Sequence, residues 1–402
     1  MAAPSFPNAP LTVKLIGWGN DLHVEDMSFN PGMAASDDPG TPLNLLVDTG
    51  SDITWVAKKG FTAMTGQTPL HRIPNPLEDS QCIDTTIRIP PGTAAQDTHR
   101  WGAIYTPGFG ASGTTRPIIN MGIGTYQTPL AIGIADQASI AGRGRYPVQN
   151  GILGLGITST TTSWPGDNGP YLPLWLQLLS KSPLAKTFSI ALDRTKLRPD
   201  DYTGTLTLGR LPNTPFPSNA ITIPLHYAPS PSPPHWSVRV QLYARVTTPP
   251  ASPTQKETIV ETLLGNNPIE IVLDTGADRV WLPQDIANHY NGHLNGMSPS
   301  AAPGFTPQKG PLFPAQAPIL QGSRDPVFDV ALVVRFVDAK TKDATVVIPA
   351  GRLVEPDQSG QAFGHGRVMG TGGMPLLGMP FFLAAGEVVF DKGGECVVVV
   401  PS

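Results

Sequence analysis

One segment of this sequence occurs twice, and the duplication constrains the fold more than any other feature. Residues 45–56 read LLVDTGSDITWV, and residues 271–282 read IVLDTGADRVWL. In both copies an apolar run, which is typical of a buried strand, stops at an acidic residue. This residue is Asp48 in the first copy and Asp274 in the second. The two aspartates are therefore the first candidates for chemistry.

Each Asp-Thr-Gly triplet is followed by a second shared pattern, in which two apolar residues precede a glycine. The pattern occurs as GILGLG at residues 151–156 and within PLLGMPFF at residues 375–382. Its glycine, Gly154 or Gly378, lies 106 positions after the aspartate in the first copy and 104 positions after it in the second. The nearly equal spacing indicates an internal repeat. We expect two lobes of similar build that each bring one aspartate to a shared interface.

Two carboxyl groups at one interface predict a particular chemistry. Carboxylates held within about 3 Å of each other cannot easily both ionise, so they share one proton, and one acts as a base while the other acts as an acid. Water bound between them would lose a proton to the ionised group while the protonated group polarises a substrate carbonyl. The glycine of each triplet permits a tight turn, and the threonine hydroxyl can brace the partner loop. This chemistry is peptide-bond hydrolysis without a covalent intermediate.

The rest of the chain predicts β structure. The 402 residues include 42 Gly and 45 Pro, a content that is high for a helical protein and suits a turn-rich β fold. Helical periodicity appears only at residues 170–182 and 283–292. The length suggests two domains, and the Pro-rich segment 211–234 leads us to predict lobes at 1–212 and 213–402. Short β-branched and aromatic runs predict strands at residues 11–17, 85–90, 204–211, 220–227, 236–246, 330–338, 344–349, 387–391 and 396–401.

Composition argues against several other classes of partner. Charged residues make up 14% of the chain and the formal net charge is -4, so we expect binding neither to nucleic acid nor to an anionic membrane. No apolar run is long enough to span a bilayer, and the N-terminus lacks a signal-peptide core, so we expect a mature chain. Cys82 and Cys396 provide no disulfide framework, and the eight histidines show no metal-binding spacing and are expected at the surface. We predict no cofactor and no metal.

The segment VDTGSDITWV resembles the N-terminal motif of pepsin-like aspartic proteases, and the resemblance covers most of the chain. It implies an all-β fold with two lobes, a few short helices and an active-site cleft between the lobes. It also implies that Asp48 and Asp274 are the catalytic pair and that Thr49 and Thr275 link their loops. Ser51 would hydrogen-bond on the Asp48 side. The residues implied to support the catalytic loops are Thr49, Gly50, Ser51, Thr275, Gly276 and Ala277.

Two further parts of the chain resemble that family. Residues 101–113, WGAIYTPGFGASG, resemble the hairpin flap that closes over substrate, and Tyr105 would replace the flap tyrosine and pair with Trp55. Thr-Pro-Gly stands there in place of the usual Gly-Thr-Gly. Residues 150–156 and 376–391 resemble the crossover segments behind the two catalytic loops. The predicted flap and substrate-binding residues are Tyr105, Trp55, Gly108 and Ile152.

The chain also departs from the family pattern. Secreted members usually carry local disulfides, which Cys82 and Cys396 cannot reproduce. Because these two cysteines fall in different predicted lobes, we expect that they are not bonded to each other. Asp52 and Asp278 follow the two motifs at matching positions, where pepsins commonly carry Ser or Thr. We expect each of these aspartates to pair with an arginine.

One more departure bears on pH. Ala277 stands where pepsins commonly carry Ser or Thr, whereas the first motif keeps Ser51. A hydroxyl that donates to a carboxylate lowers its pKa, so its absence predicts a higher pKa for Asp274 and activity at weakly acidic pH. Ala277→Thr is then expected to move the alkaline limit of activity downward.

These features predict an aspartic endopeptidase that acts as a monomer on polypeptides bound as an extended strand. We expect an extracellular, vacuolar or lysosomal location. The alternative is a catalytically silent protein of the same fold that serves as a binding protein or an inhibitor. A homodimeric retroviral-type protease is disfavoured, because that arrangement needs only one motif per chain.

Overall fold

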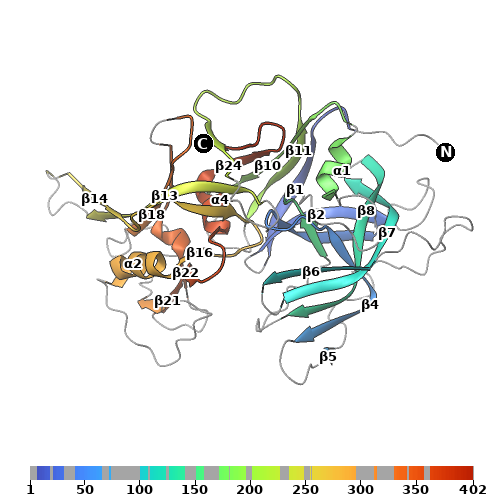
Figure 1. Ribbon diagram of the computed structural model, residues 1–402, viewed down its shortest axis with the longest axis horizontal. Helices are drawn as coiled ribbons and strands as arrows, with labels where there is room; N and C mark the ends of the chain where they lie inside the picture. Colours follow the sequence, from blue (N-terminus) through green and yellow to red (C-terminus); the bar gives the residue numbers. More distant parts are fainter. Residues whose placement is uncertain are drawn as a thin grey trace, which may run out of the picture.

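The structure of the chain is a computed structural model in which β-strands dominate (Figure 1). The described strands form three sheets, and the described helices are short, which confirms the predicted all-β fold. No helix in the described part of the chain is long and apolar enough to span a membrane. The structure describes residues 7–18, 21–30, 41–65, 72–73, 100–106, 109–123, 126–140, 151–157, 172–180, 182–195, 202–226, 235–248, 254, 256–295, 312–314, 330–341, 344–356 and 363–401.

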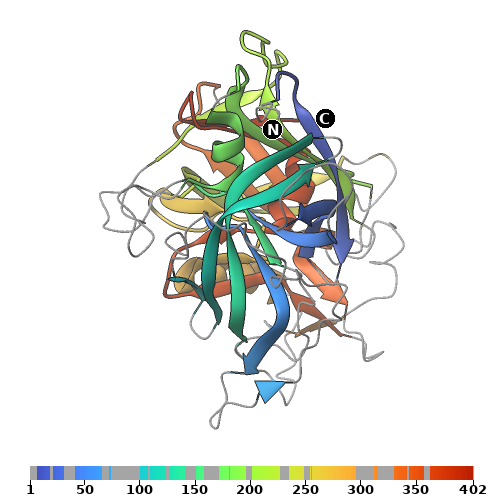
Figure 2. The same ribbon diagram turned by 90° about the vertical axis from the view of Figure 1, so that its right-hand side faces the viewer.

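The largest sheet has 14 strands and combines strands from both ends of the sequence. Figure 2 looks onto the side where β4 and the neighbouring strands of this sheet face the viewer. Strand β5 (Arg72–Ile73) pairs only with β4. In order across the sheet, the other strands are β12 (Ile221–Pro224), β25 (Cys396–Val400), β24 (Glu387–Asp391), β10 (Ala185–Leu192), β11 (Thr203–Arg210), β1 (Leu11–Trp18), β2 (Asp21–Asn30), β3 (Thr41–Asp48), β9 (Gly151–Gly154), β4 (Trp55–Thr65), β8 (Tyr126–Ile140), β7 (Phe109–Ile123) and β6 (Arg100–Thr106).

The second sheet has eight strands, all from the second half of the chain. In order they are β19 (Thr345–Ile348), β18 (Val330–Phe336), β13 (Ser237–Thr248), β15 (Ile269–Leu273), β23 (Leu376–Leu377), β16 (Val280–Pro283) and β22 (Val368–Thr371), and β14 (Thr258–Leu263) pairs with β13. The third sheet consists of β17 (Leu312–Pro314), β21 (Phe363–Gly366) and β20 (Val354–Pro356). The predicted strands are confirmed wherever the structure describes them, and the predicted strand at 85–90 lies outside the described residues.

Four helices occur among the described residues. The predicted helices at 170–182 and 283–292 correspond to α1 (Leu174–Ser180) and α2 (Gln284–Asn295). Sequence reasoning missed α3 (Ala350–Leu353) and α4 (Met379–Ala385). Every residue of α4 is buried, so its sequence carries no alternation of apolar and polar positions from which a helix could be predicted.

The internal repeat is visible as the same strand arrangement in both large sheets. In the first sheet, β9 lies between β3 and β4, parallel to β3 and antiparallel to β4. In the second sheet, β23 lies between β15 and β16 in the same two senses. In each sheet, the strand that leads to the aspartate and the strand that comes after its loop are therefore separated by a third strand. The loop that carries the aspartate crosses this gap at the end of the sheet.

A cluster of buried aromatic rings joins the two halves of the chain behind these loops. Trp175 of α1 packs against Phe188 of β10 and Trp236, which pack against each other and against Phe390 of β24, with ring centroids 4.6–6.2 Å apart. The indole N–H of Trp236 donates to the carbonyl of Leu155 at 2.8 Å. Aromatic residues from both halves of the chain therefore pack behind the Asp48 loop, and one of them bonds Leu155.

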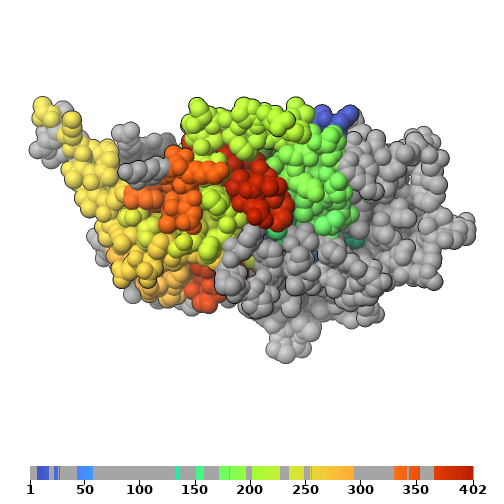
Figure 3. Space-filling view, turned by 45° about the horizontal axis from the view of Figure 1, so that its top comes forward, coloured from blue at the N-terminus to red at the C-terminus, as the bar shows by residue number. Residues whose placement is uncertain are grey.

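The first sheet also crosses the predicted boundary between 1–212 and 213–402. Strands β12, β24 and β25 belong to the second predicted lobe, yet β24 pairs with β10. In Figure 3 the red segment that contains β24 and β25 lies against the green segment that contains β10. The boundary itself stays a prediction.

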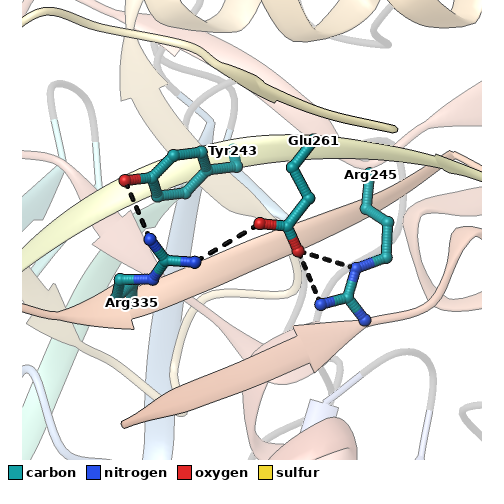
Figure 4. Close-up of polar contacts among 4 residues, drawn as sticks. All are labelled: Tyr243, Arg245, Glu261 and Arg335. Carbon is teal, nitrogen blue, oxygen red and sulfur yellow. Dashed lines mark hydrogen bonds and ion pairs between the residues drawn. The ribbon is translucent and has the colours of Figure 1, made fainter. Parts of the chain in front are cut away.

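In the second sheet, β13 and β14 form a hairpin that protrudes from the molecule (Figures 1 and 3). Figure 4 shows Glu261 of β14 between two arginines, with Oε1 2.6 Å from Arg245 and Oε2 3.3 Å from Arg335. The guanidinium of Arg335 also lies 4.4 Å from the ring centre of Tyr243. These partly exposed ion pairs tie β14 to β13 and β18, although such pairs contribute little stability.

Candidate active site

The two aspartates of the repeated triplet meet at the centre of the molecule. Asp48 ends β3, and Asp274 follows the last residue of β15. Their side chains are hydrogen-bonded to each other. Asp48 is buried and Asp274 is partly buried. The structure therefore brings together the two residues that the duplication singled out.

Burial dominates the electrostatics of this pair. It raises the pKa of Asp48 well above the ordinary value of 3.8, and the negative charge of Asp274 raises it further, against the backbone N–H groups of Gly50 and Ser51. Burial also raises the pKa of Asp274, against hydrogen bonds from Asp48, Gly276 and Gly50 and the nearby His235. One proton shared between a protonated Asp48 and an ionised Asp274 fits these opposing effects.

Thr49 and Thr275 link the two loops through four reciprocal hydrogen bonds. The N–H of Thr49 donates to Oγ1 of Thr275 at 3.1 Å, and the N–H of Thr275 donates to Oγ1 of Thr49 at 3.0 Å. The Thr49 hydroxyl donates to the Leu273 carbonyl at 2.8 Å, and the Thr275 hydroxyl donates to the Val47 carbonyl at 2.7 Å. Because each threonine bonds the strand that precedes the other aspartate, the loops are fixed to each other as one unit.

The glycines of the triplets are required by space rather than by an unusual backbone angle. A Cβ atom on Gly50 would lie 2.8 Å from the carboxyl atoms of Asp274, and one on Gly276 would lie 2.7 Å from those of Asp48. Neither glycine has a positive φ. The predicted turn is present at Thr275 and Gly276, and the glycine is needed there for space. Each glycine lets the opposite carboxyl group approach its backbone.

The two apolar-apolar-Gly patterns pass behind the loops, as their resemblance to crossover segments implied. A Cβ atom on Gly154 would lie 2.6 Å from the carbonyl oxygen of Ile53, and one on Gly378 would lie 2.3 Å from that of Ala277. The Asp48 carbonyl accepts a bond from the N–H of Leu155 at 2.8 Å. Backbone contacts this close explain why both patterns end in glycine.

The sequence predicted that the hydroxyl of Ser51 bonds the Asp48 side, but the backbone N–H of Ser51 makes that bond. The Ser51 hydroxyl donates to the carbonyl of Ile53 at 3.3 Å and accepts from its N–H at 3.2 Å. The bond to Asp48 is made by the Ser51 backbone N–H, at 3.1 Å from Oδ1. The N–H of Ala277 instead donates to the main-chain carbonyl of Asp274, at 3.2 Å. The two halves therefore differ by a backbone donor, not by a hydroxyl donated to a carboxylate.

The predicted flap is present as a hairpin, although the structure does not describe all of its residues. Strands β6 and β7 pair from Arg100 with Thr114 to Thr106 with Phe109, and the ladder shifts at Tyr105. The side chain of Tyr105 and the whole of Gly108 lie outside the described residues. The predicted contact between Tyr105 and Trp55 therefore stays a prediction.

Two other predicted binding residues lie inside the first sheet. Trp55 of β4 pairs with Ile152 of β9, and the two residues are 3% and 0% exposed. Ile152 thus has no surface that a substrate could touch, and its predicted binding role is corrected to packing behind the Asp48 loop. Trp55 is likewise part of the protein interior, which agrees with one of the two roles that its sequence position allows.

The structure also bears on the predicted partners of Asp52 and Asp278 and on the predicted state of the cysteines. Asp278 pairs with Arg279, with 3.3 Å between Oδ2 and Nε, as expected. The arginine partner expected for Asp52 stays a prediction. Cys396 is a buried free thiol, in agreement with the expectation that it is not bonded to Cys82, which lies outside the described residues.

Sequence reasoning missed His235, because the histidines were expected at the surface. This residue is partly buried two residues before β13, and its ring donates a hydrogen bond to the carbonyl of Gly50. Asp274 is among the acids that act on it. A histidine immediately before a predicted strand gives no sign of this contact, since the antiparallel partner of that strand lies over thirty positions later. Within the described residues, no three His, Cys, Asp or Glu side chains gather as metal ligands.

Comparisons with known proteins agree with this arrangement of the two aspartates. The family model for eukaryotic aspartyl protease matches residues 38–395. Among solved structures, the chain is similar to the crystal structure of an aspartic proteinase from Irpex lacteus, with a TM-score of 0.64 and 16% sequence identity over 98% of each chain. A comparison with curated protein sequences gives no match.

Proposed function

Because this chain belongs to the eukaryotic aspartyl protease family, we propose that it is an active aspartic endopeptidase. Peptide bonds would be hydrolysed by a water molecule that Asp48 and Asp274 activate together. The observation that carries the proposal is the hydrogen-bonded pair of buried carboxyl groups, held by loops that Thr49 and Thr275 lock to each other. A protein that only binds peptides has no need of two acids in this arrangement.

In the proposed reaction, each aspartate has one role per step. The carboxylate of Asp274 accepts a proton from water, and the water oxygen attacks the carbonyl carbon of the peptide bond. The Asp48 carboxyl group gives its proton to the carbonyl oxygen, so that no negative charge remains on the tetrahedral intermediate. The proton held by Asp274 then passes to the departing amine as the C–N bond breaks, while the Asp48 carboxylate takes back a proton from one hydroxyl of the intermediate, which leaves as the product carboxylic acid. A shared proton of this kind is the known behaviour of the family.

We further propose that the substrate is a polypeptide in extended conformation, bound by a single chain. Strand β6 stands at the end of the largest sheet among the described strands. An extended peptide can add to such an edge through main-chain hydrogen bonds. Both aspartates belong to one chain, so the reaction needs no second copy.

The test is cleavage of an unfolded protein across acidic to neutral pH, with and without pepstatin. Asp48→Asn and Asp274→Asn are each expected to lower kcat by about a thousandfold or more, because an amide cannot exchange the shared proton. Asp338→Asn is the matched control, because this carboxylate is exposed and pairs with Arg239 at 3.6 Å. Its activity should equal that of the parent protein.

Two results would contradict the proposal. If either pair variant cleaves substrate at a rate close to that of the parent, the pair does not carry the reaction. If the folded parent cleaves nothing at any pH yet binds pepstatin or peptides, the chain is the silent binding protein of the same fold.

A further inference from the structure

We propose that His235 is a positioning residue for the catalytic pair: it holds the peptide unit between Gly50 and Ser51 and, when protonated, keeps the negative charge of the pair on Asp274. This inference rests on the proposed function, since it assigns the residue a part in that reaction. Three features of the structure support it.

The first feature is the register of two strands. Strands β13 and β15 are antiparallel, with Ser237 opposite Val272. The pairing continues toward the active site, where the N–H of Leu273 donates to the carbonyl of Trp236 at 3.0 Å. His235 precedes Trp236 and Asp274 follows Leu273, so the two residues extend from the same end of this strand pair. The histidine is therefore held beside the catalytic pair by the sheet itself.

The second feature is a chain of hydrogen bonds from His235 to Asp48. The imidazole donates to the carbonyl of Gly50. That carbonyl belongs to the same peptide unit as the N–H of Ser51, which donates to Oδ1 of Asp48 at 3.1 Å. Donation to the carbonyl of a peptide polarises the unit and strengthens its N–H as a donor. His235 thus both fixes the direction of this N–H and reinforces its bond to Asp48.

The third feature is the set of charges around the ring. Among the described residues, Asp274, Asp52 and Glu270 all act on His235, and all three are acidic. Glu270 also faces His226, with 3.7 Å between Oε2 and Nε2. Burial lowers the pKa of His235 from 6.5, and the three acids oppose that effect. The charged form of the ring is therefore favoured by the three acids and opposed by burial.

These features predict an effect on one side of the pH profile only. At acidic pH the imidazolium lowers the pKa of Asp274, so the pair keeps its negative charge to lower pH than it would without His235. Because burial lowers the pKa of His235 from 6.5, the ring loses its charge as pH rises, and this effect fades toward the alkaline limit. His235 therefore extends activity toward acid and leaves the alkaline limit unchanged.

Two variants separate the hydrogen bond from the charge. His235→Gln keeps an N–H donor without the titrating charge, and His235→Phe removes both. We expect His235→Gln to raise the acid limit of kcat/KM by about one pH unit while the alkaline limit stays in place. We expect His235→Phe to show the same shift together with a fall in kcat of about tenfold, which His235→Gln largely restores.

His226→Gln is the matched control, because it removes a histidine that also faces Glu270 but does not contact Gly50. Its pH profile should match that of the parent. An acid limit in His235→Gln equal to that of the parent would overturn the charge role. Equal kcat in His235→Phe and the parent would overturn the positioning role. Thermal unfolding of each variant shows whether it is folded.

A second readout does not depend on activity. NMR titration of the His235 imidazole should give a lower pKa in Asp274→Asn than in the parent, because one of the acids that favour the charged ring is removed. If the parent is inactive and this difference is still seen, the proposed function fails while the coupling stands. If the parent is active and the His235 pKa is the same in both proteins, the inference fails while the proposed function stands.

Discussion

The loops around Asp48 and Asp274 are braced in the same way but have different electrostatic surroundings. Both are fixed by the same reciprocal threonine bonds, and both contain a glycine against the opposite carboxyl group. Asp48 is the more buried of the two, whereas His235 lies on the side of Asp274. Duplication thus built a symmetrical frame, and unequal burial and charge decide which aspartate holds the proton.

The comparison also shows which effect is larger. Asp48 accepts N–H bonds from both Gly50 and Ser51, which by themselves would lower its pKa. Burial and the neighbouring carboxylate nevertheless raise it well above 3.8. Hydrogen bonds from the loop therefore moderate the pKa of Asp48 without reversing its direction.

The largest expected effect comes from filling the space on either side of this frame. In Gly50→Ala or Gly276→Ala, the new methyl group would overlap the opposite carboxyl group, so the pair must separate. We expect at least a hundredfold loss of kcat/KM and a loss of about 1–3 kcal/mol in the free energy of unfolding. Steady-state cleavage and urea unfolding measure the two quantities. A fully active Gly50→Ala would show that the two carboxyl groups need not be this close.

A slightly smaller effect is expected from the threonines, where the two halves should respond alike. Thr49→Val and Thr275→Val each remove two hydrogen bonds and leave a buried N–H of the other loop without its acceptor. We expect each change to lower the free energy of unfolding by about 2–4 kcal/mol. Chemical denaturation of both variants checks the symmetry. A difference of more than about 1 kcal/mol between them would mean that the frame is less symmetrical than its hydrogen bonds indicate.

Much of this frame follows from the sequence, since a repeated triplet at equal distance from a repeated glycine pattern specifies both the duplication and the pair. Other features depend on contacts that local sequence does not encode. The close approach that requires Gly50, the burial of Ile152 and the bond from His235 to Gly50 all arise where segments distant in sequence meet. Helix α4 was missed for another reason, because a segment buried on every side has no periodic pattern.

The pair should also make stability depend on pH. The pKa of Asp48 is raised on folding, so the native state binds more protons than the unfolded state once pH exceeds 3.8. Stability is then fully present below that pH and is lost as pH rises through the folded pKa, by up to about 1.4 kcal/mol per pH unit. Asp48→Asn should flatten this dependence more than Asp274→Asn does. Thermal unfolding at a series of pH values measures it, and an equal slope in Asp48→Asn and the parent would contradict it.

The smallest expected effect concerns Ala277. The Ser51 hydroxyl bonds the main chain two residues later, and a hydroxyl at position 277 in the similar loop would do the same. Ala277→Ser should therefore shift the alkaline limit of kcat/KM by less than about 0.3 pH unit, a change well below the shift of about one unit that a new bond to the carboxylate would cause. A clear downward shift would restore the explanation based on a missing hydroxyl, for which Ala277→Thr is the companion variant.

The most direct test of the shared proton is carbon-13 NMR of the labelled aspartate carboxyl groups, with Asp48→Asn and Asp274→Asn used to assign the two signals. The account predicts that, as pH rises from about 3 to about 8, the pair loses its protons in two separate steps, and that the second step lies well above 3.8, the ordinary value for an aspartate. Loss of both protons together near 3.8 would contradict it, because the two carboxyl groups would then titrate as independent, solvated acids.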